Sequence, residues 1–557
     1  MSVVLSEHLP LIATAPDGIQ KLRGLILELA VRGKLVPQDP KDEPASELLK
    51  RIAQVRAQLE AEGVCKKSKT PPLSGDEVWP SALAPGWSWT NLATVALINP
   101  RNSADDLTEA SFVPMAMIGN RFEGSHEQET RKWSEIKQGF THFAEGDVGV
   151  AKITPCFENS KACVFTDLRN GIGAGTTELH IVRPLGNTLS PRYVLAYLKA
   201  PMFLAVGETK MTGTAGQKRL PKDFLESNPF PLPPLAEQHR IVAKVDELMA
   251  LCDRLEAEQT ASASAHTRLV ETLLSTLTQS VNAADLTANW QRLAEHFDTL
   301  FTTEVSLDAL KQTILQLAVM GKLVSQNASD EPANVLLQKI PKPKKAFAPI
   351  DDGELLFEIP SNWQWARLGE VFVGGSGTTP PRTRHDYFDA GTEYWVKTTD
   401  LNNALVTTCE ELITPQAVTD CNLSYYPVET VCIAMYGGAG TIGKTGVLGI
   451  TSTINQSVFA LPPVKYISPA FTHYYLKSIR GIWMRFAAGL RVAANINGQI
   501  IKNMVFPVPP LNEQNRIVAK VDALMTLCDR MKADLATASQ RQATLADTLI
   551  ETALEAA

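Results

Sequence analysis

The sequence predicts an α+β protein in which two pseudo-repeated α+β domains are joined by a pair of long antiparallel coiled-coil helices. Three features predict this fold class: two internal repeats that differ in register, a heptad pattern of apolar residues in each copy of the second repeat, and two unlike middle segments rich in short apolar runs. A length of 557 residues also favours several domains over one.

The first repeat is short and helical. Residues 22–52 match residues 310–340 at 18 of 31 positions, an offset of 288. Apolar residues recur at helical spacing in LILELAV and TILQLAV, and Gly33 and Gly321 follow at the point where each helix is expected to end. We expect Lys34 and Lys322 to lie beside the last carbonyl groups of these two helices.

The second repeat begins each long helix. Residues 230–258 match residues 506–534 at 21 of 29 positions, an offset of 276. In the first copy, Pro233 and Pro234 set the backbone for entry into the helix, and Glu237 in the first turn favours the helix dipole. A helix of about 45 residues would be a rod of roughly 65 Å.

Apolar or small residues follow one another along each long helix in alternating steps of four and three, which is the pattern of a helix-pair seam. We expect the two seams to pair with each other; the alternative is that each helix packs on its own domain as an ordinary amphipathic helix. The seam residues are Ile241, Val245, Leu248, Cys252 and Leu255 in the first copy and Ile517, Val521, Leu524, Cys528 and Met531 in the second.

The middle segments, residues 87–229 and 363–505, have equal length and almost no sequence in common. Runs such as DVGVAKI, LHIVRP, TVCIAMYGG and QSVFALPP predict strands, and SPRYVLAYLKA and SPAFTHYYLKS predict helices. A repeated scaffold that presents two different recognition surfaces would have this pattern. Packing restrains the sequence of the scaffold, whereas the sequences of two surfaces that bind different ligands would diverge. The predicted parts are a helical block with a linker (1–80), a first domain (81–230), a central helical region (231–345), a second domain (346–505) and a final long helix (506–557).

Composition excludes several classes of protein. A net charge of −7 and a pI of about 5.8 do not fit a uniformly basic nucleic-acid coat. No apolar stretch reaches the roughly 20 residues that span a bilayer, and the first residues lack the basic flank of a secretory signal, so we expect a cytoplasmic protein. The eight cysteines include no C-x-x-C pair, so we expect free, mostly buried thiols and neither a zinc site nor a disulfide framework.

Charge is distributed unevenly along the chain. Residues 81–230 carry 15 basic and 15 acidic residues and residues 363–505 carry 11 and 9, which leaves −9 on the helical scaffold. Residues 431–505 hold seven basic residues and no acidic one, and a second basic cluster lies at residues 210–222. Mixed with Asn, Gln and Thr, such patches suit a phosphate backbone and base edges, although they are also typical of a solvated face.

Three features of the sequence resemble nucleotide-binding, catalytic or metal-binding motifs, but none of them meets the requirements of such a site. The stretch GAGTIGKT at residues 438–445 matches a phosphate loop, but the Gly-rich, β-branched sequence after Lys444 favours a hairpin over the helix such a loop requires. Asn228-Pro-Phe-Pro resembles the catalytic loop of base methyltransferases without its second proline in place, and we interpret it as a domain exit. His8 and His296 have no partners at metal-ligand spacing, so no catalytic residue and no metal site is predicted.

The repeated segments PPLAEQHRIVAKVDELMALCDRLE and PPLNEQNRIVAKVDALMTLCDRMK, with LAVRGKLVPQDPKDEPASELL, resemble the specificity (S) subunit of Type I restriction-modification enzymes over nearly the whole chain. The resemblance implies two target-recognition domains, each followed by a helical region. It implies no catalysis by this chain, which would be the targeting subunit of a DNA adenine methyltransferase and ATP-dependent endonuclease complex. Each domain would read one half of an asymmetric bipartite site, with the helices fixing the spacing.

The partners that the resemblance implies are double-stranded DNA, two methyltransferase subunits and two restriction/translocase subunits. S-adenosylmethionine, ATP and Mg²⁺ would then bind to those partners and not to this chain. A specificity subunit of a stand-alone methyltransferase complex without a nuclease fits the same sequence. A nucleotide-binding enzyme built on the phosphate-loop match is the less favoured alternative, and a purely structural adaptor that uses the helices alone is a further one.

Within this interpretation, we expect side chains near the end of each recognition domain to contact DNA, since GTAGQKRLPKDF and AAGLRVAANING resemble alternative loops of such domains. Arg, Asn and Gln can pair with base edges, whereas Lys more often binds phosphate. The expected DNA-binding residues are Lys210, Thr214, Gln217, Lys218 and Arg219 in the first domain and Lys444, Arg491, Asn495, Asn497, Arg382 and Arg384 in the second.

Overall fold

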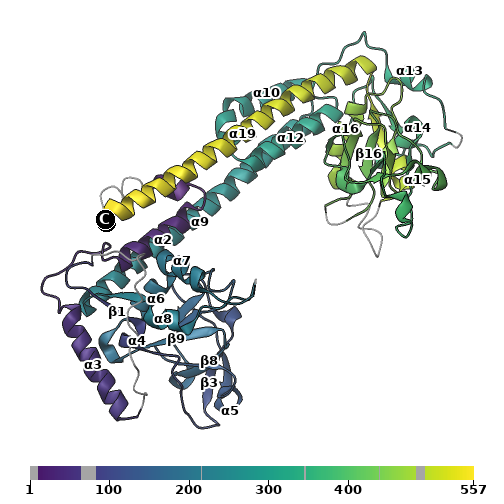
Figure 1. Cartoon of the computed structure of the whole chain (residues 1–557). Coiled ribbons are helices and arrows are strands. Elements are labelled where there is room, and N and C mark those ends of the chain that lie inside the picture. The colour runs from purple at the N-terminus through teal and green to yellow at the C-terminus, as the bar shows by residue number, and fades with distance from the viewer. Residues whose placement is uncertain are drawn as a thin grey trace. The chain divides into compact units, whose positions relative to one another are not determined.

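The computed structural model describes residues 10–63, 83–214, 216–343, 346–437, 440–483 and 496–556. The chain divides into two compact units, Met1–Ser262 with Ala538–Ala557, and Ala263–Thr537. The long helix α9 (Leu235–Gln279) begins in the first unit and ends in the second, and α19 (Leu511–Ala556) begins in the second and ends in the first (Figure 1). The predicted fold class is confirmed.

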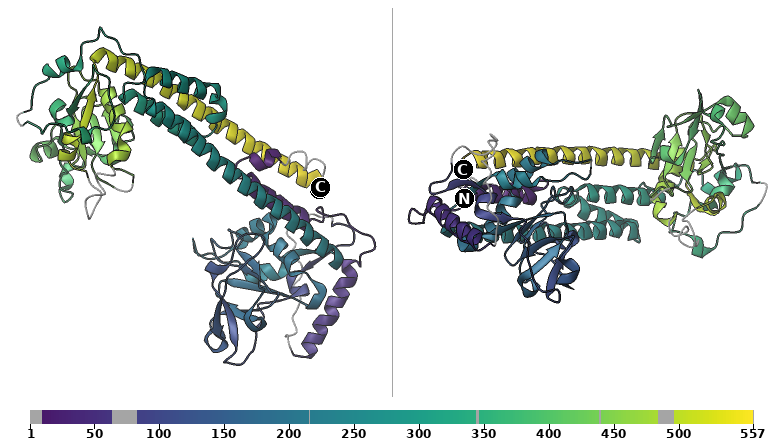
Figure 2. Two further views of the ribbon diagram at one scale, coloured as in Figure 1. Left: turned by 180° about the vertical axis from the view of Figure 1, so that it is seen from behind. Right: turned by 60° about the horizontal axis from the view of Figure 1, so that its bottom comes forward.

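In the first unit, the scaffold consists of α2 (Gly18–Val31), α3 (Ala45–Ala61), the first half of α9 and the last turns of α19. Arg23 of α2 forms a 2.6 Å ion pair with Asp253 of α9. Lys21, on the same helix, forms a 2.6 Å ion pair with Asp547 of α19. The end of α19 therefore lies beside α2, as both views of Figure 2 show.

The second unit repeats this scaffold. Its helices are α10 (Ala283–Glu295), α11 (Phe297–Leu300), α12 (Glu304–Val319) and α13 (Ala333–Gln338), with the end of α9 and the first part of α19. Lys311 of α12 pairs with Asp529 of α19 at the positions that Arg23 and Asp253 hold in the first copy.

Both short helices end as predicted. Gly33 and Gly321 adopt a φ of 70°, and the N–H of the lysine after each glycine bonds the carbonyl five residues back at 2.9 Å. The side chain of Lys322 differs from the prediction. Its Nζ donates to the carbonyls of Thr278 and Ser280, at 2.7 and 3.0 Å, because the unpaired carbonyls at the end of α9 lie next to it.

Substituting Gly321 with alanine is expected to lower the free energy of unfolding of the second unit by about 1–3 kcal/mol, since αL backbone penalises a Cβ and the new atom would lie 2.5 Å from Pro360 Cγ. Thermal unfolding of Gly321→Ala measures the effect. Gly353→Ala is the control, because its Cβ meets nothing within 4 Å; equal stability of the two variants would contradict the prediction.

The first recognition domain contains two four-stranded sheets, ordered β2-β9-β6-β7 and β4-β3-β8-β5. The strands are β2 (Ala96–Ile98), β3 (Glu109–Val113), β4 (Glu129–Lys132), β5 (Thr141–Ala144), β6 (Val148–Ala151), β7 (Ala162–Val164), β8 (Ile172–Gly175) and β9 (Leu179–Pro184). The helices are α4 (Leu92–Val95), α5 (Trp133–Ile136), α6 (Pro191–Lys199), α7 (Pro201–Lys210) and α8 (Lys222–Ser227).

The second recognition domain has a five-stranded sheet, β12-β19-β16-β17-β14, and a three-stranded one, β15-β13-β18. Its strands are β12 (Gly375–Ser376), β13 (Glu393–Val396), β14 (Ala404–Val406), β15 (Leu412–Ile413), β16 (Val431–Ala434), β17 (Thr445–Leu448), β18 (Thr453–Ile454) and β19 (Val458–Leu461). Its helices are α14 (Leu368–Val371), α15 (Pro415–Asp420), α16 (Pro469–Ser478) and α18 (Gly498–Asn503).

Each domain is closed where the chain enters and leaves it. In the first domain, β1 (Ser88–Asn91) pairs antiparallel with β10 (Pro229–Leu232). In the second, β11 (Gln364–Arg367) pairs with β20 (Val505–Val508) in the same register. The Asn-Pro-Phe-Pro segment is thus part of a domain exit. The second repeat begins within β10 and β20, but it does not indicate the strands with which they pair.

The predicted seam residues lie in two cores. Ile241, Val245, Leu248 and Cys252 are buried in one core with α2 and with Ala546 and Ala553 of α19, and Leu255 packs against it. The second set lies in a separate core with α12 and with Val270, Leu274 and Leu277 of α9: Ile517, Val521 and Cys528 are buried, and Leu524 and Met531 are partly buried. Each long helix therefore contributes to both cores, and the pairing of the named seam residues with one another stays a prediction. The five-part division of the chain stays a prediction.

A glutamine at the start of each long helix binds the adjacent recognition domain. Gln238 Oε1 accepts the Ser190 N–H at 2.8 Å, and Gln514 Oε1 accepts the Ser468 N–H at 2.7 Å. Both glutamines are fully buried. Ser190 and Ser468 directly precede α6 and α16, so the same polar contact mounts each domain on its long helix.

Candidate nucleic-acid interface

A hairpin with residues 212–214 and 216–219 contains four of the residues predicted to bind DNA in the first domain. The N–H of Thr212 and the carbonyl of Arg219 bond at 3.1 Å, and the reverse bond is 2.8 Å. Its base is tied to Thr154, whose Oγ1 accepts the Lys218 N–H at 3.1 Å. Thr214, Gln217, Lys218 and Arg219 are all exposed, and Lys210 is the exposed last residue of α7, two positions before the hairpin.

Arg219 is held by a carboxylate that sequence reasoning missed. Its Nε and Nη2 donate to the two oxygens of Glu178, each at 2.9 Å. These hydrogen bonds lower the pKa of Glu178. Glu178 lies 41 residues before Arg219, in the connection from β8 to β9, and no spacing in the sequence indicates that the two meet.

The chain after Lys444 forms a hairpin, as predicted, and not a helix. The strand β17 begins at Thr445, directly after the lysine, and pairs antiparallel with β16. A phosphate loop requires a helix at this point, so its backbone arrangement is not formed here. Lys444 is half-buried, and its N–H donates to the carbonyl of Thr441 at 3.0 Å.

Asn497 has a local role. Its Oδ1 accepts the N–H groups of Gln499 and Ile500, at 3.0 and 2.9 Å, which caps the N-terminus of α18. Since the carbonyl oxygen is engaged in this way, a paired contact with a base is not available to the side chain as it stands. Arg491 and Asn495 lie outside the described residues, as does His8.

Arg382 and Arg384 are paired with carboxylates and stacked on aromatic rings. Arg382 donates through Nη1 and Nη2 to Glu411, and its guanidinium lies 4.5 Å from the ring centre of Phe388. Arg384 donates through Nε and Nη2 to Asp386, at 2.8 and 2.6 Å, and lies 4.2 Å from the ring centre of Tyr387. The two arginines therefore present different edges of the guanidinium.

Two further cations of the second domain point to a pocket of about 580 Å³ beside α12. Lys477 Nζ donates to the carbonyl of Asn403 at 3.3 Å, and Arg480 donates to the carbonyls of Gly440 and Ile442. Burial lowers the pKa of Lys477. Both belong to the acid-free stretch of residues 431–505, and within the described parts of the chain neither forms an ion pair with a carboxylate.

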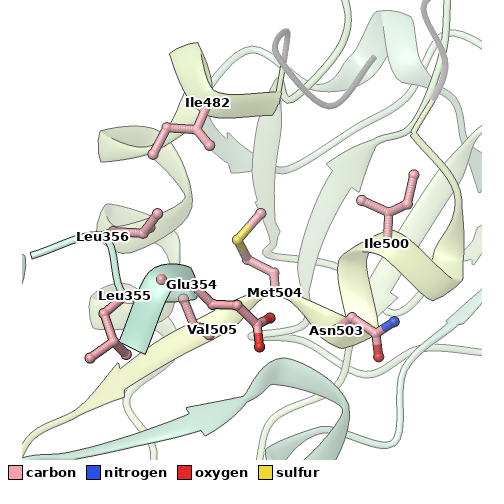
Figure 3. Close-up of a pocket in the computed structure, with 9 residues that line it drawn as sticks. Glu354, Leu355, Leu356, Ile482, Ile500, Asn503, Met504 and Val505 are labelled. Carbon is pink, nitrogen blue, oxygen red and sulfur yellow. The ribbon is translucent and has the colours of Figure 1, made fainter. Parts of the chain in front are cut away.

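An apolar cavity of about 520 Å³ lies next to α18 (Figure 3). Among the described residues, its lining is mostly apolar and includes no basic side chain: Leu355, Leu356, Ile482, Ile500 and Met504. Glu354 at its edge accepts two hydrogen bonds from Arg367, at 2.8 and 2.9 Å, which lower its pKa to about 2.

Replacing Glu354 with glutamine is expected to destabilise the second unit by about 1 kcal/mol at pH 7, because the amide offers the buried Arg367 one neutral acceptor in place of the two charged oxygens of the carboxylate. The carboxylate stabilises the fold above its ordinary pKa of 4.5, and this contribution is lost as the pH falls toward 2. Chemical denaturation from pH 7 to pH 3 should show a smaller decline for Glu354→Gln; parallel declines would contradict it.

The described residues contain no group of three or more His, Cys, Asp or Glu that could hold a metal ion. None of the helices they form combines the length and apolarity needed to cross a membrane. The seven cysteines among them are free, and Cys163, Cys252, Cys432 and Cys528 are buried.

Comparison with known proteins agrees with this architecture. The family model of the Type I restriction modification DNA specificity domain matches residues 92–263 and 360–537. The Type I restriction enzyme EcoAI specificity subunit of Escherichia coli is 44% identical over 561 residues, covering 96% of this chain and 94% of its own. The EcoEI specificity subunit of Escherichia coli is 42% identical over 566 residues, with the same coverage.

One solved structure is described as the structural basis of complex assembly and conformational transition of the type I R-M system. A chain of that structure shares the fold of this protein, with a TM-score of 0.52 at 20% identity. It is matched over 85% of this chain and 99% of its own length. The fold and the two matched domains define a DNA specificity protein of the type I class. The chain belongs to the family of type I restriction-modification specificity subunits.

Proposed function

We propose that this chain directs a type I restriction-modification complex to an asymmetric bipartite DNA site. Each recognition domain reads one half of the site, and the long helices set the distance between the halves. The chain performs no catalysis itself: methylation of adenine and ATP-dependent cleavage belong to its partners, which bind S-adenosylmethionine, ATP and Mg²⁺.

One observation carries the proposal: two segments of the scaffold are repeated, with 18 of 31 and 21 of 29 residues identical, whereas the domains mounted on it share almost no sequence. Gln238 and Gln514 make the same buried contact to α6 and α16. Arg240 and Arg516 likewise pair with Asp42 and Asp330. The contacts that hold the two domains on the scaffold are the same, whereas the sequences of the domains differ. The two domains are therefore built to bind different ligands in equivalent positions.

The same repetition supports docking of two identical partners. A surface that occurs twice on one chain can bind two copies of one protein, and the methyltransferase subunits of the complex are the partners we assign to it. Two restriction/translocase subunits complete the assembly. A complex without the nuclease would use the same surfaces on this chain.

Mapping of methylated adenines across the genome tests the proposal. Cells that express the chain with its methyltransferase partner should show one bipartite motif with two unlike halves and a fixed spacer. Cells that express the partner alone should lack that motif. A methylation pattern that does not depend on this chain, or a motif without a gap, would overturn the proposal.

A further inference from the structure

We propose that Arg219 reads a guanine in the half-site of the first domain and that Glu178 is the positioning residue for it. This inference rests on the proposed function, because it assigns one base contact within the DNA reading that the first domain performs. The observation behind the inference is which edge of the Arg219 guanidinium binds the Glu178 carboxylate.

A guanidinium has two edges that can make paired hydrogen bonds. Glu178 occupies the side edge of Arg219, formed by Nε and Nη2, with both bonds at 2.9 Å. The end edge, formed by Nη1 and the outer hydrogen of Nη2, is left for a paired contact with O6 and N7 of guanine. Nη1 lies 3.4 Å from the carbonyl of Gln217, longer than an ordinary hydrogen bond, so this edge can accept a better partner.

The position of the arginine fits a base contact. Its side chain is 46% exposed, on a hairpin whose other side chains Gln217 and Lys218 are also exposed. Glu178 is less exposed, at 24%, and fixes the guanidinium from the side of the domain. A fixed guanidinium loses less rotational freedom when it binds, which favours discrimination between bases over general attraction to DNA.

The arginines of the second domain provide a contrast. Glu411 occupies the end edge of Arg382 through Nη1 and Nη2, so that arginine has a different edge left for a base than Arg219 has. Asp386 occupies the side edge of Arg384, as Glu178 does for Arg219. The three arginines therefore differ in which edge of the guanidinium binds a carboxylate, a difference that the residue type alone does not show.

Duplexes with single-atom changes test the inference. The probe is the mapped site in which one guanine at a time is replaced by 7-deazaguanine, which lacks the N7 acceptor. Binding is measured for the full-length chain in complex with its methyltransferase subunits. For the wild-type protein, one guanine in the half read by the first domain should lose about tenfold in affinity when N7 is removed, since a hydrogen bond to a charged donor is lost.

The variants separate base reading from structure and from phosphate binding. Arg219→Ala should show almost no additional loss at that guanine, because alanine has no donor for N7. Glu178→Gln should lose most of the discrimination while melting at nearly the wild-type temperature. Lys218→Ala should weaken binding to all duplexes alike and lower the salt dependence by about one phosphate contact. Arg169→Ala, at another exposed arginine of the domain, should respond as the wild type does.

Each outcome is decisive. If a bipartite site is methylated but the tenfold loss is the same in Arg219→Ala as in the wild type, or if the half-site has no guanine, the assignment of Arg219 is wrong and the proposed function stands. If discrimination persists in Glu178→Gln, the positioning role is wrong. If no defined site exists, the proposed function fails and this inference fails with it.

Discussion

Replacing Ala546 with aspartate is expected to unfold the first unit and to leave the second unit folded. Ala546 is far from most of the first unit in the sequence. Ala546 is fully buried in the core that also holds α2 and the first half of α9. An unpaired carboxylate in that core would cost about 3–5 kcal/mol, a large part of the stability of a domain.

Hydrogen exchange measures this effect because it reports each helix separately. The amides of α2 should lose protection in Ala546→Asp, whereas those of α12 should not. Val270→Asp is the mirror variant, since Val270 occupies the equivalent position on α9 and is buried in the core of the second unit. Thr544→Asp places the same charge on an exposed position of α19. Equal loss of protection in both units would show that the units do not fold as described.

The second large effect is expected at the mounting of each domain. Gln514→Leu removes a buried amide and leaves the Ser468 N–H and the carbonyls of Pro509 and Tyr466 without their partner. We expect a loss of about 2–4 kcal/mol, because each buried polar group without a hydrogen bond is costly. The orientation of the second domain on α19 should be lost before the scaffold unfolds.

The consequence for DNA is specific to one half of the site. Gln514→Leu should weaken reading of the half bound by the second domain, and Gln238→Leu should weaken the other half. Affinity for duplexes with one scrambled half measures this. Asn515→Ala, on the exposed face next to Gln514, should bind as the wild type does. A uniform loss over both halves in either glutamine variant would contradict the account.

Much of the architecture can be predicted from the sequence because duplication exposes it. The repeat around Gly33 and Gly321 predicts two helices and their ends, and the structure has both. The heptad pattern predicts two helices of about 45 residues, and α9 and α19 have 45 and 46. Periodicity does not say which surface covers an apolar face. For that reason the packing of α2 and α12 on the seams was not predicted.

The candidate interface was predicted less well than the fold. The basic cluster at residues 210–222 and the resemblance of GTAGQKRLPKDF to a loop of such domains locate the segment that carries Gln217 and Arg219, although not its hairpin. The sequence does not identify Glu178, since the contact depends on how distant loops meet. It also does not separate Asn497 as a helix cap from a base-reading asparagine, because the same amide serves either purpose.

Exchange of one middle segment tests the central claim most directly. Residues 87–229 are replaced by the corresponding segment of another specificity subunit, and the methylated motif is mapped genome-wide. The account predicts that one half of the motif changes while the other half and the spacer length remain as before. An unchanged motif, or a change in both halves, would contradict the claim that two independently reading domains are held by one repeated frame.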